Sequence, residues 1–276
     1  MQESSRNAQI ASAFRPRWFI FPKEHGAWAM WIVPGVIGAG LAGANYGLSA
    51  LFLTSVLLWY WARYPVWQWA RSRGRRFPSE AVPSVVVTAF AGTVMASALA
   101  VAYGRWGVFA FGAALAVLGA VHLLLLMKSN ERAIAAEFAG IASLGLTGPA
   151  TYYFATGTLN SQVFLSWLLP FLFFGTSVFA VKLRVEGHVH RKAGRSYRPL
   201  VVSLVAYQVL VPVVMCAVAA LGYASFWTLI AFVPVTLQAI WTPWTLQSPP
   251  RFKQLGILWT IHSAIFTALL LALVQD

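Results

Sequence analysis

Between residues 82 and 127 the sequence contains a single charged side chain, that of Arg105. An apolar run of roughly 20 residues is long enough to cross the hydrocarbon core of a bilayer as a helix. Two such runs flank Arg105, and similar runs recur along the chain. The chain is 59% hydrophobic and only 10% charged, whereas a soluble domain of this size needs more charge to cover its surface. We therefore predict an all-α, polytopic transmembrane helix bundle.

The apolar runs predict about nine membrane spans. Their expected ranges are 27–45, 47–63, 82–102, 106–127, 134–156, 163–183, 199–220, 225–243 and 255–274. Proline is expected to kink the fifth helix within "TGPATYY" and to interrupt or end the eighth helix. Residues 1–20 are expected to form a cytoplasmic N-terminal tail, and residues 21–276 a single transmembrane helical domain.

The distribution of basic residues predicts the topology of these spans. If the N-terminus is cytoplasmic, nineteen of the twenty Lys and Arg residues fall on the cytoplasmic side, and only Arg105 falls on the other side. Basic residues concentrate on the cytoplasmic side of membrane proteins. The net charge of +13 is then explained by topology and by attraction to anionic lipid headgroups. We expect membrane lipids as partners and no nucleic acid.

Polar residues in and near the spans gather toward the predicted cytoplasmic side. Such groups are costly in a membrane unless they face one another or a wet cavity. A polar cavity that opens to the cytoplasm is therefore expected. Its candidate residues are Lys23, Glu24, His25, Asn130, Glu131, Arg132, Glu137, Lys182, Arg184, Glu186 and His262.

Within this set, Glu24, His25 and Glu137 are predicted to be catalytic, because carboxyl and imidazole groups exchange protons near neutral pH. The remaining candidates are predicted to bind substrate, with the cations holding a phosphate. Asn130 and Glu137 are seven residues apart and share a helical face. For Lys23 and Glu24 a simpler role, as a topology signal and a favourable charge at a helix N-terminus, stays open.

The segment "VKLRVEGHVHRKAGR" places Lys182 and Glu186, and then Glu186 and His190, four residues apart. Each pair would meet on one face if the sixth helix continued beyond the membrane. A metal site formed by Glu186, His188 and His190 is an alternative, but a solvated basic loop is the favoured interpretation. Which metal, if any, the protein binds is left open; Mg²⁺ is one candidate.

Several motifs resemble those of the YwiC-like family of bacterial membrane proteins. They are "PKEHGAWAM", "ARYPVWQW", "NERAIAAEFAGIASLGLTGPATYY" and "FFGTSVFAVKLRVEGHVHRKAG". The resemblance runs from about residue 21 to the end of the sixth predicted helix, and more loosely beyond. It implies a multi-pass protein of the bacterial cytoplasmic membrane and assigns no activity.

The predicted architecture is also similar to that of the UbiA superfamily of intramembrane prenyltransferases, whose two longest loops follow the second and sixth helices. That resemblance implies aspartates near these loops, which hold Mg²⁺ and a diphosphate. This chain departs from the pattern, because its only aspartate is Asp276 and the loop after the second helix offers only Glu80 among five arginines.

Three functions remain open on these grounds. The first is an intramembrane enzyme that handles an isoprenoid or lipid phosphate in the cytoplasm-facing cavity. The second is a transporter of a small or lipidic solute through the same cavity. The third is a non-catalytic membrane factor. The enzyme ranks first by analogy of fold, which is a weak guide to function.

Overall fold

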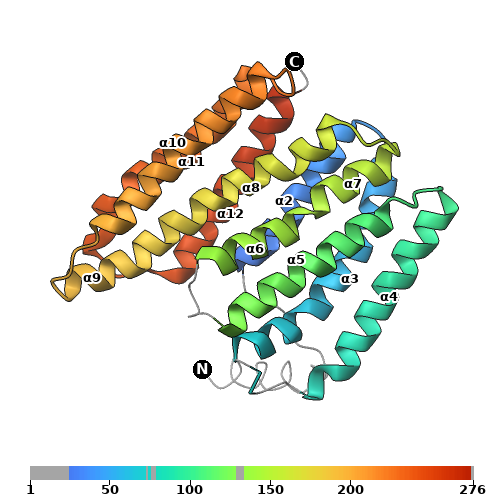
Figure 1. Ribbon diagram of the computed structural model, residues 1–276, viewed down its shortest axis with the longest axis horizontal. Helices are drawn as coiled ribbons and strands as arrows, with labels where there is room; N and C mark the ends of the chain where they lie inside the picture. The colour runs from blue at the N-terminus through green and yellow to red at the C-terminus, as the bar shows by residue number, and fades with distance from the viewer. Residues whose placement is uncertain (1–24, 73, 76–78, 129–133, 275–276) are drawn as a thin grey trace, which may run out of the picture.

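The computed structural model describes residues 25–72, 74–75, 79–128 and 134–274. Within these ranges the secondary structure is helical and contains no strand, so the predicted all-α class is confirmed (Figure 1). The elements, in chain order, are α2 (His25–Ala42), α3 (Tyr46–Arg71), η1 (Ser79–Ala81), α4 (Val82–Ala102), α5 (Val108–Lys128), α6 (Ile134–Gly145), α7 (Thr147–Thr156), α8 (Ser161–Lys182), η2 (Leu183–Gly187), α9 (His188–Lys192), α10 (Arg198–Ala220), η3 (Phe226–Phe232), α11 (Val233–Trp241), η4 (Thr242–Gln247) and α12 (Phe252–Leu273).

Six helical stretches are long and apolar enough to cross a membrane. They are Val82–Ala102, Val108–Lys128, Ser161–Lys192, Arg198–Ala220, Phe226–Gln247 and Phe252–Leu273. Helices also occupy the other expected ranges, but α3 contains two arginines and several aromatic residues, and the fifth range is divided into α6 and α7. The structure thus gives the helices of a multi-pass membrane protein, while the number of nine spans stays a prediction.

Proline shapes the fifth and eighth helices much as the sequence predicted. The fifth is broken at Leu146, between α6 and α7, where Pro149 in the first turn of α7 has no N–H to donate to the preceding turn. The eighth begins as the 3₁₀ helix η3 and becomes α-helical at Val233, beside Pro234. Proline is well tolerated in the first turn of a helix.

The sixth helix is longer than predicted. It continues from α8 through the π-helical turn η2 into α9, and the left-handed Gly194 (φ 66°) follows its end. The continuation brings Lys182 and Glu186 together, with Lys182 Nζ 3.5 Å from Glu186 Oε1. This i,i+4 pair was predicted and is confirmed. The same continuation carries the basic segment of α9 outward from the bundle, to the lower left of Figure 1.

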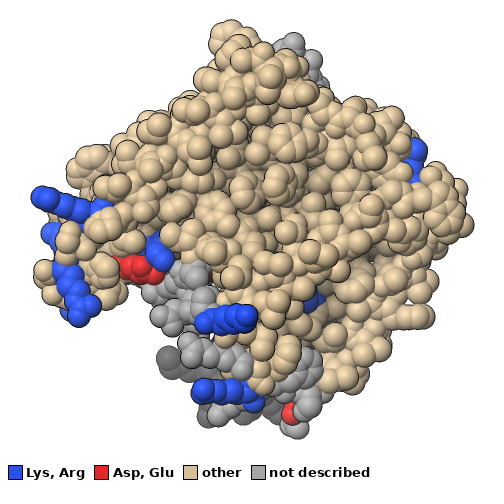
Figure 2. Space-filling view, in the orientation of Figure 1, with Lys and Arg blue, Asp and Glu red and all other residues tan. Residues whose placement is uncertain are grey.

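Basic side chains gather at one end of the bundle. On the face shown in Figure 2, most of them lie near α9 and the lower ends of α3 and α5. We call this the basic end; Arg71, Lys128, Arg191 and Arg251 mark it at the ends of α3, α5 and α9 and the start of α12. Arg105 lies at the opposite end, where its Nε donates to the carbonyl of Phe154 at 3.2 Å. That bond satisfies a carbonyl in the last turn of α7.

Helix α2 crosses α7 closely enough for two glycines to meet. A Cβ atom built on Gly38 would overlap the carbonyl oxygen of Gly148, and one built on Gly148 would overlap the carbonyl oxygen of Ser166. Small residues let the backbones of membrane helices approach in this way. The crossing holds α2 against α7 and α8, and these helices form part of the wall of the site described below.

We expect Gly38→Ala to lower the stability of the folded protein, because the added methyl group would collide with a backbone carbonyl that cannot rotate away. Overpacking typically costs about 1–3 kcal/mol. Gly112→Ala on α5 is the matched control, because nothing lies within 4 Å of its Cβ position. Thermal unfolding in detergent measures both variants. Equal midpoints for the two would show that the α2–α7 crossing is looser than the structure indicates.

Candidate ligand-binding cavity

A cavity of about 470 Å³ lies within the bundle, between α2, α3, α5, α6, α8 and α12. We call it the central cavity. Most of its wall is apolar, with side chains such as Met30, Ile141, Phe174 and Val178. Its ionisable lining residues are Arg63, Arg71, His122, Glu137 and Lys182. A largely apolar wall with a small polar cluster is typical of ligand sites.

Glu137 provides the carboxylate of the central cavity. It lies in the first turn of α6, and its exposed side chain lines the cavity. Arg71, Lys182 and Arg63 are near enough to act on it electrostatically. These are three cations; Glu137, and Glu186 paired with Lys182, are two acids, so the cluster keeps an excess of one positive charge. Such an excess favours an anionic ligand.

The two arginines come from α3, where Arg63, Trp67 and Arg71 are spaced four residues apart and share a helical face. All three residues line the central cavity. The Arg71 guanidinium carbon lies 5.0 Å from the centroid of the Trp67 ring, in a cation–π contact. The tryptophan therefore helps to position Arg71 toward the cavity. The sequence interpretation counted both arginines as topology signals and missed this role.

His122 is buried on α5, with only 6% of its surface exposed. Its Nδ1 lies 2.7 Å from the carbonyl oxygen of Ala136, so Nδ1 carries a proton and donates it. Its Nε2 has no hydrogen-bond partner among the described residues and is left as an acceptor. The hydrogen bond to Ala136 on α6 gives His122 a structural role. The cavity position of the ring adds a second role, which the sequence did not predict.

The other predicted site residues lie in different places. Lys23, Glu24, Asn130, Glu131 and Arg132 lie outside the described residues. His25 begins α2, but nothing is described of its side chain. Ala27, two residues later, lines the central cavity, so the helix that follows the opening motif enters the site.

Three predicted substrate-binding residues do not line the central cavity. Glu186 forms an ion pair with Lys182 but does not itself line the cavity. His262 directs Nδ1 to the carbonyl oxygen of Leu258, 2.9 Å away on its own helix. Arg184 lines a separate pocket instead. The expectation that Lys182 and Arg184 hold one ligand together is therefore corrected: residues two apart on a helix point to different sides.

The described residues form no group of three or more His, Cys, Asp or Glu side chains that could hold a metal ion. In the segment considered for such a site, His188 Nδ1 lies 2.9 Å from the carbonyl oxygen of Leu246. The predicted pairing of Glu186 with His190 is also not seen, because His190 Nδ1 has no hydrogen-bond partner in the described structure.

Comparison with known proteins finds relatives over the segment that begins with the opening motif. The model of the family described as YwiC-like protein matches residues 21–152. The resemblance to the YwiC-like family is confirmed. The chain is also 26% identical over 253 residues to the uncharacterized protein YwiC of Bacillus subtilis (strain 168), covering 91% of this chain and 96% of that protein. No solved structure matches the chain significantly. The matched residues include all of α2, α3, α5 and α6, which are four of the six helices around the central cavity.

Proposed function

We propose that this YwiC-like protein is an intramembrane enzyme that binds an isoprenoid or lipid phosphate in the central cavity. The observation that carries the proposal is the lining of that cavity, where Arg63, Arg71 and Lys182 surround Glu137 beside an apolar wall. A phosphate fits the cations through charge-assisted hydrogen bonds. The apolar wall fits a hydrocarbon chain. An amphiphile with a phosphate head satisfies both parts of the cavity.

In this proposal the carboxyl group of Glu137 and the Nε2 atom of His122 move protons, and the three cations hold the phosphate. Glu137 lies near the cations that would contact the phosphate, and His122 Nε2 has no hydrogen-bond partner among the described residues. General acid–base catalysis by such groups typically contributes about 10²–10⁴-fold to a rate. By analogy with the UbiA-like architecture, the proposed reaction transfers the isoprenoid group from its phosphate to an acceptor. The carbon–oxygen bond to the phosphate breaks, a bond from that carbon to the acceptor forms, the acceptor's proton passes to Glu137, and the phosphate leaves held by the cations.

The proposal includes nine spans in the bacterial cytoplasmic membrane, with the N-terminus in the cytoplasm. The basic end, where the central cavity lies, would then face the cytoplasm, which is the side on which basic residues concentrate. The catalytic roles of Glu24 and His25 stay part of the proposal, and Ala27, shortly after them in the sequence, lines the cavity. Lipid phosphates present their heads at that membrane surface, so the ligand could enter laterally with its chain in the bilayer.

Labelling from outside intact cells tests this topology. The exposed native cysteine, Cys216, is first replaced by serine, and single cysteines are introduced as Leu159→Cys and Arg191→Cys. Both positions are exposed in the structure. We expect an impermeant maleimide to label position 159 only. Labelling of position 191 without position 159 would invert the topology and contradict a cytoplasm-facing cavity.

Transport is the second candidate, favoured by the break between α6 and α7. Broken helices mark the binding sites of many transporters, and Leu144, two residues before the break, lines the central cavity. Mass spectrometry of lipids that co-purify with the protein, before and after incubation with added polyprenyl phosphate, separates the candidates. An enzyme converts the added lipid to a new species, whereas a transporter retains or exchanges it unchanged. Absence of any phosphate-bearing lipid would contradict the enzyme and the transport of a lipid phosphate.

A further inference from the structure

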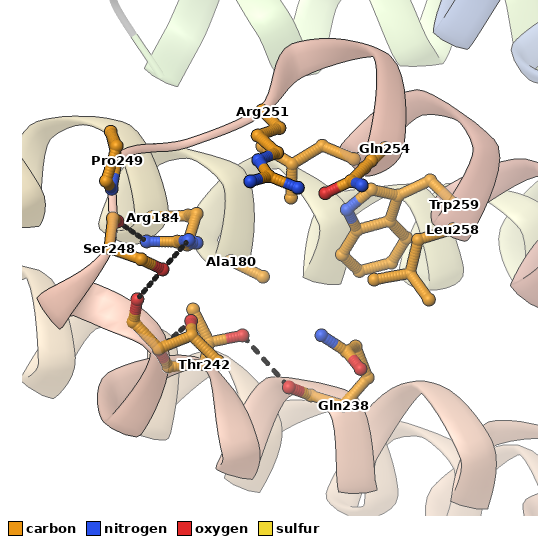
Figure 3. A pocket seen from close by; sticks show the side chains of 12 residues that line it. Ala180, Arg184, Gln238, Thr242, Ser248, Pro249, Arg251, Gln254, Leu258 and Trp259 are labelled. Atoms are coloured by element: carbon orange, nitrogen blue, oxygen red, sulfur yellow. Dashed lines mark hydrogen bonds between the residues drawn. The ribbon is translucent and has the colours of Figure 1, made fainter.

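A second pocket, of about 390 Å³, lies between α8, α11, η4 and the start of α12 (Figure 3). We call it the arginine pocket, because Arg184 and Arg251 line it. Its other polar lining includes Gln238, Thr242 and Gln254. No acidic residue is among the described residues that line it. Two full positive charges without a counter-charge in the wall make it a site for an anion.

Arg184 is held in position by the end of η4. Its Nη1 donates to the carbonyl oxygen of Ser248 at 2.7 Å, and its Nη2 donates to Ser248 Oγ at 3.1 Å. A guanidinium has five N–H donors, so these two bonds orient the group and leave other donors for a ligand. A cationic side chain that is already held in place loses less conformational entropy when it binds a ligand.

Arg251 and the two glutamines complete the polar wall from the opposite sides. In Figure 3 the Arg251 guanidinium and the Gln254 amide lie together above the hollow, and the Gln238 amide points into it from α11. No hydrogen bond or ion pair of the Arg251 side chain occurs among the described residues. Donors from three elements therefore converge on one space. This arrangement suits the several oxygens of a phosphate group.

The surroundings of the arginine pocket are apolar and exposed. Leu237, Trp241 and Trp244 are adjacent in sequence to the lining residues Gln238, Thr242 and Thr245 on α11 and η4, and each is more than 60% exposed. Aromatic side chains of this kind concentrate at membrane interfaces. A free phosphate makes no use of such a surface, whereas the acyl chains of a lipid can pack along it. The pocket also lies at the basic end, where the polar ends of the helices meet.

We propose that the arginine pocket binds the phosphate of an anionic phospholipid, with its acyl chains along the exposed face of α11 and α12. Basic pockets between membrane helices commonly hold lipid headgroups. The site is separate from the central cavity: Arg184 and Arg251 do not line that cavity, although Leu255 and Trp259 form a wall common to both. The lipid bound here is a resident ligand and does not depend on the proposed reaction.

Native mass spectrometry of the full chain in detergent micelles tests this site, with phosphatidylglycerol as the probe. We expect Arg251→Gln to weaken binding of the first phosphatidylglycerol at least about tenfold, as expected for the loss of one charge-assisted contact. Lys253→Gln is the matched control, because it removes the same charge two residues away and outside the pocket lining. Diacylglycerol, which has no phosphate, is expected to bind both variants equally.

Arg251→Gln is preferred to a change at Arg184, because Arg184 also stabilises the end of η4 through its hydrogen bond to Ser248. The Arg63→Gln, Lys182→Gln double variant is a second control and is expected to keep the phosphatidylglycerol site. Equal affinity of wild type and Arg251→Gln would overturn the proposal. Displacement of the lipid by inorganic phosphate at equal concentration would also overturn it, because the pocket would then recognise free phosphate. If the double variant loses the site, the ligand lies in the central cavity instead.

Discussion

Replacing Arg63 and Lys182 by glutamine is expected to abolish binding of a polyprenyl phosphate by the central cavity. Both side chains line the cavity and act on Glu137 from different helices, α3 and α8. Each charge-assisted hydrogen bond to a phosphate contributes about 1.5–3 kcal/mol. Loss of two such contacts corresponds to a decrease in affinity of at least roughly 100-fold. Binding of a fluorescent or isotope-labelled polyprenyl phosphate to the purified protein measures the effect.

The matched control for this double variant is Arg75→Gln with Lys192→Gln. It removes one arginine and one lysine from the basic end, and both side chains are exposed and outside the central cavity lining. An unspecific loss of positive charge would weaken both double variants equally. That result would show that the ligand is attracted to the basic end in general and is not held in the cavity.

Glu137→Gln is expected to separate binding from chemistry. The substitution removes a negative charge from among three cations, so an anionic ligand loses a repulsive partner and binds as tightly as before or more tightly. Turnover is expected to fall by about 10²–10⁴-fold, because an amide does not exchange protons as a carboxyl group does. Product formation and ligand affinity are measured on the same preparation.

His122→Asn tests the imidazole in the same way. The amide can still donate to the Ala136 carbonyl, so a fall in turnover would reflect the loss of Nε2. If Glu137→Gln weakens binding and leaves turnover per bound ligand unchanged, Glu137 is a ligand contact and not a proton carrier. If it changes neither quantity, the central cavity is not the catalytic site, and the transport or non-catalytic functions are favoured.

Much of the helical arrangement could be predicted from the sequence, because apolar length and proline position are local properties. The break at Leu146 follows from the neighbouring glycine and proline, and the Lys182–Glu186 pair follows from helical spacing. Glu137 could be placed toward the interior because a carboxylate facing lipid is costly. Each of these inferences depends on the sequence of a single helix and not on how helices pack together.

The composition of the central cavity could not be predicted in this way, because it depends on how distant helices pack. Arg63 and Arg71 approach Glu137 from α3, more than sixty residues earlier in the chain. A basic residue near a span end gives the same sequence signal whether it marks topology or lines a site. The four-residue spacing of Arg63, Trp67 and Arg71 was the available clue. Likewise, the two-residue spacing of Lys182 and Arg184 already indicated two different faces.

Photo-crosslinking with a diazirine-bearing polyprenyl phosphate tests most directly whether a lipid phosphate occupies the central cavity. The diazirine is placed in the first isoprene unit, close to the phosphate. We predict cross-linked peptides from the cavity wall on α8, around Phe174 and Val178, and their loss in the Arg63→Gln, Lys182→Gln variant. Cross-links confined to outward-facing positions such as Val205 and Val209 on α10, unchanged in that variant, would contradict the account.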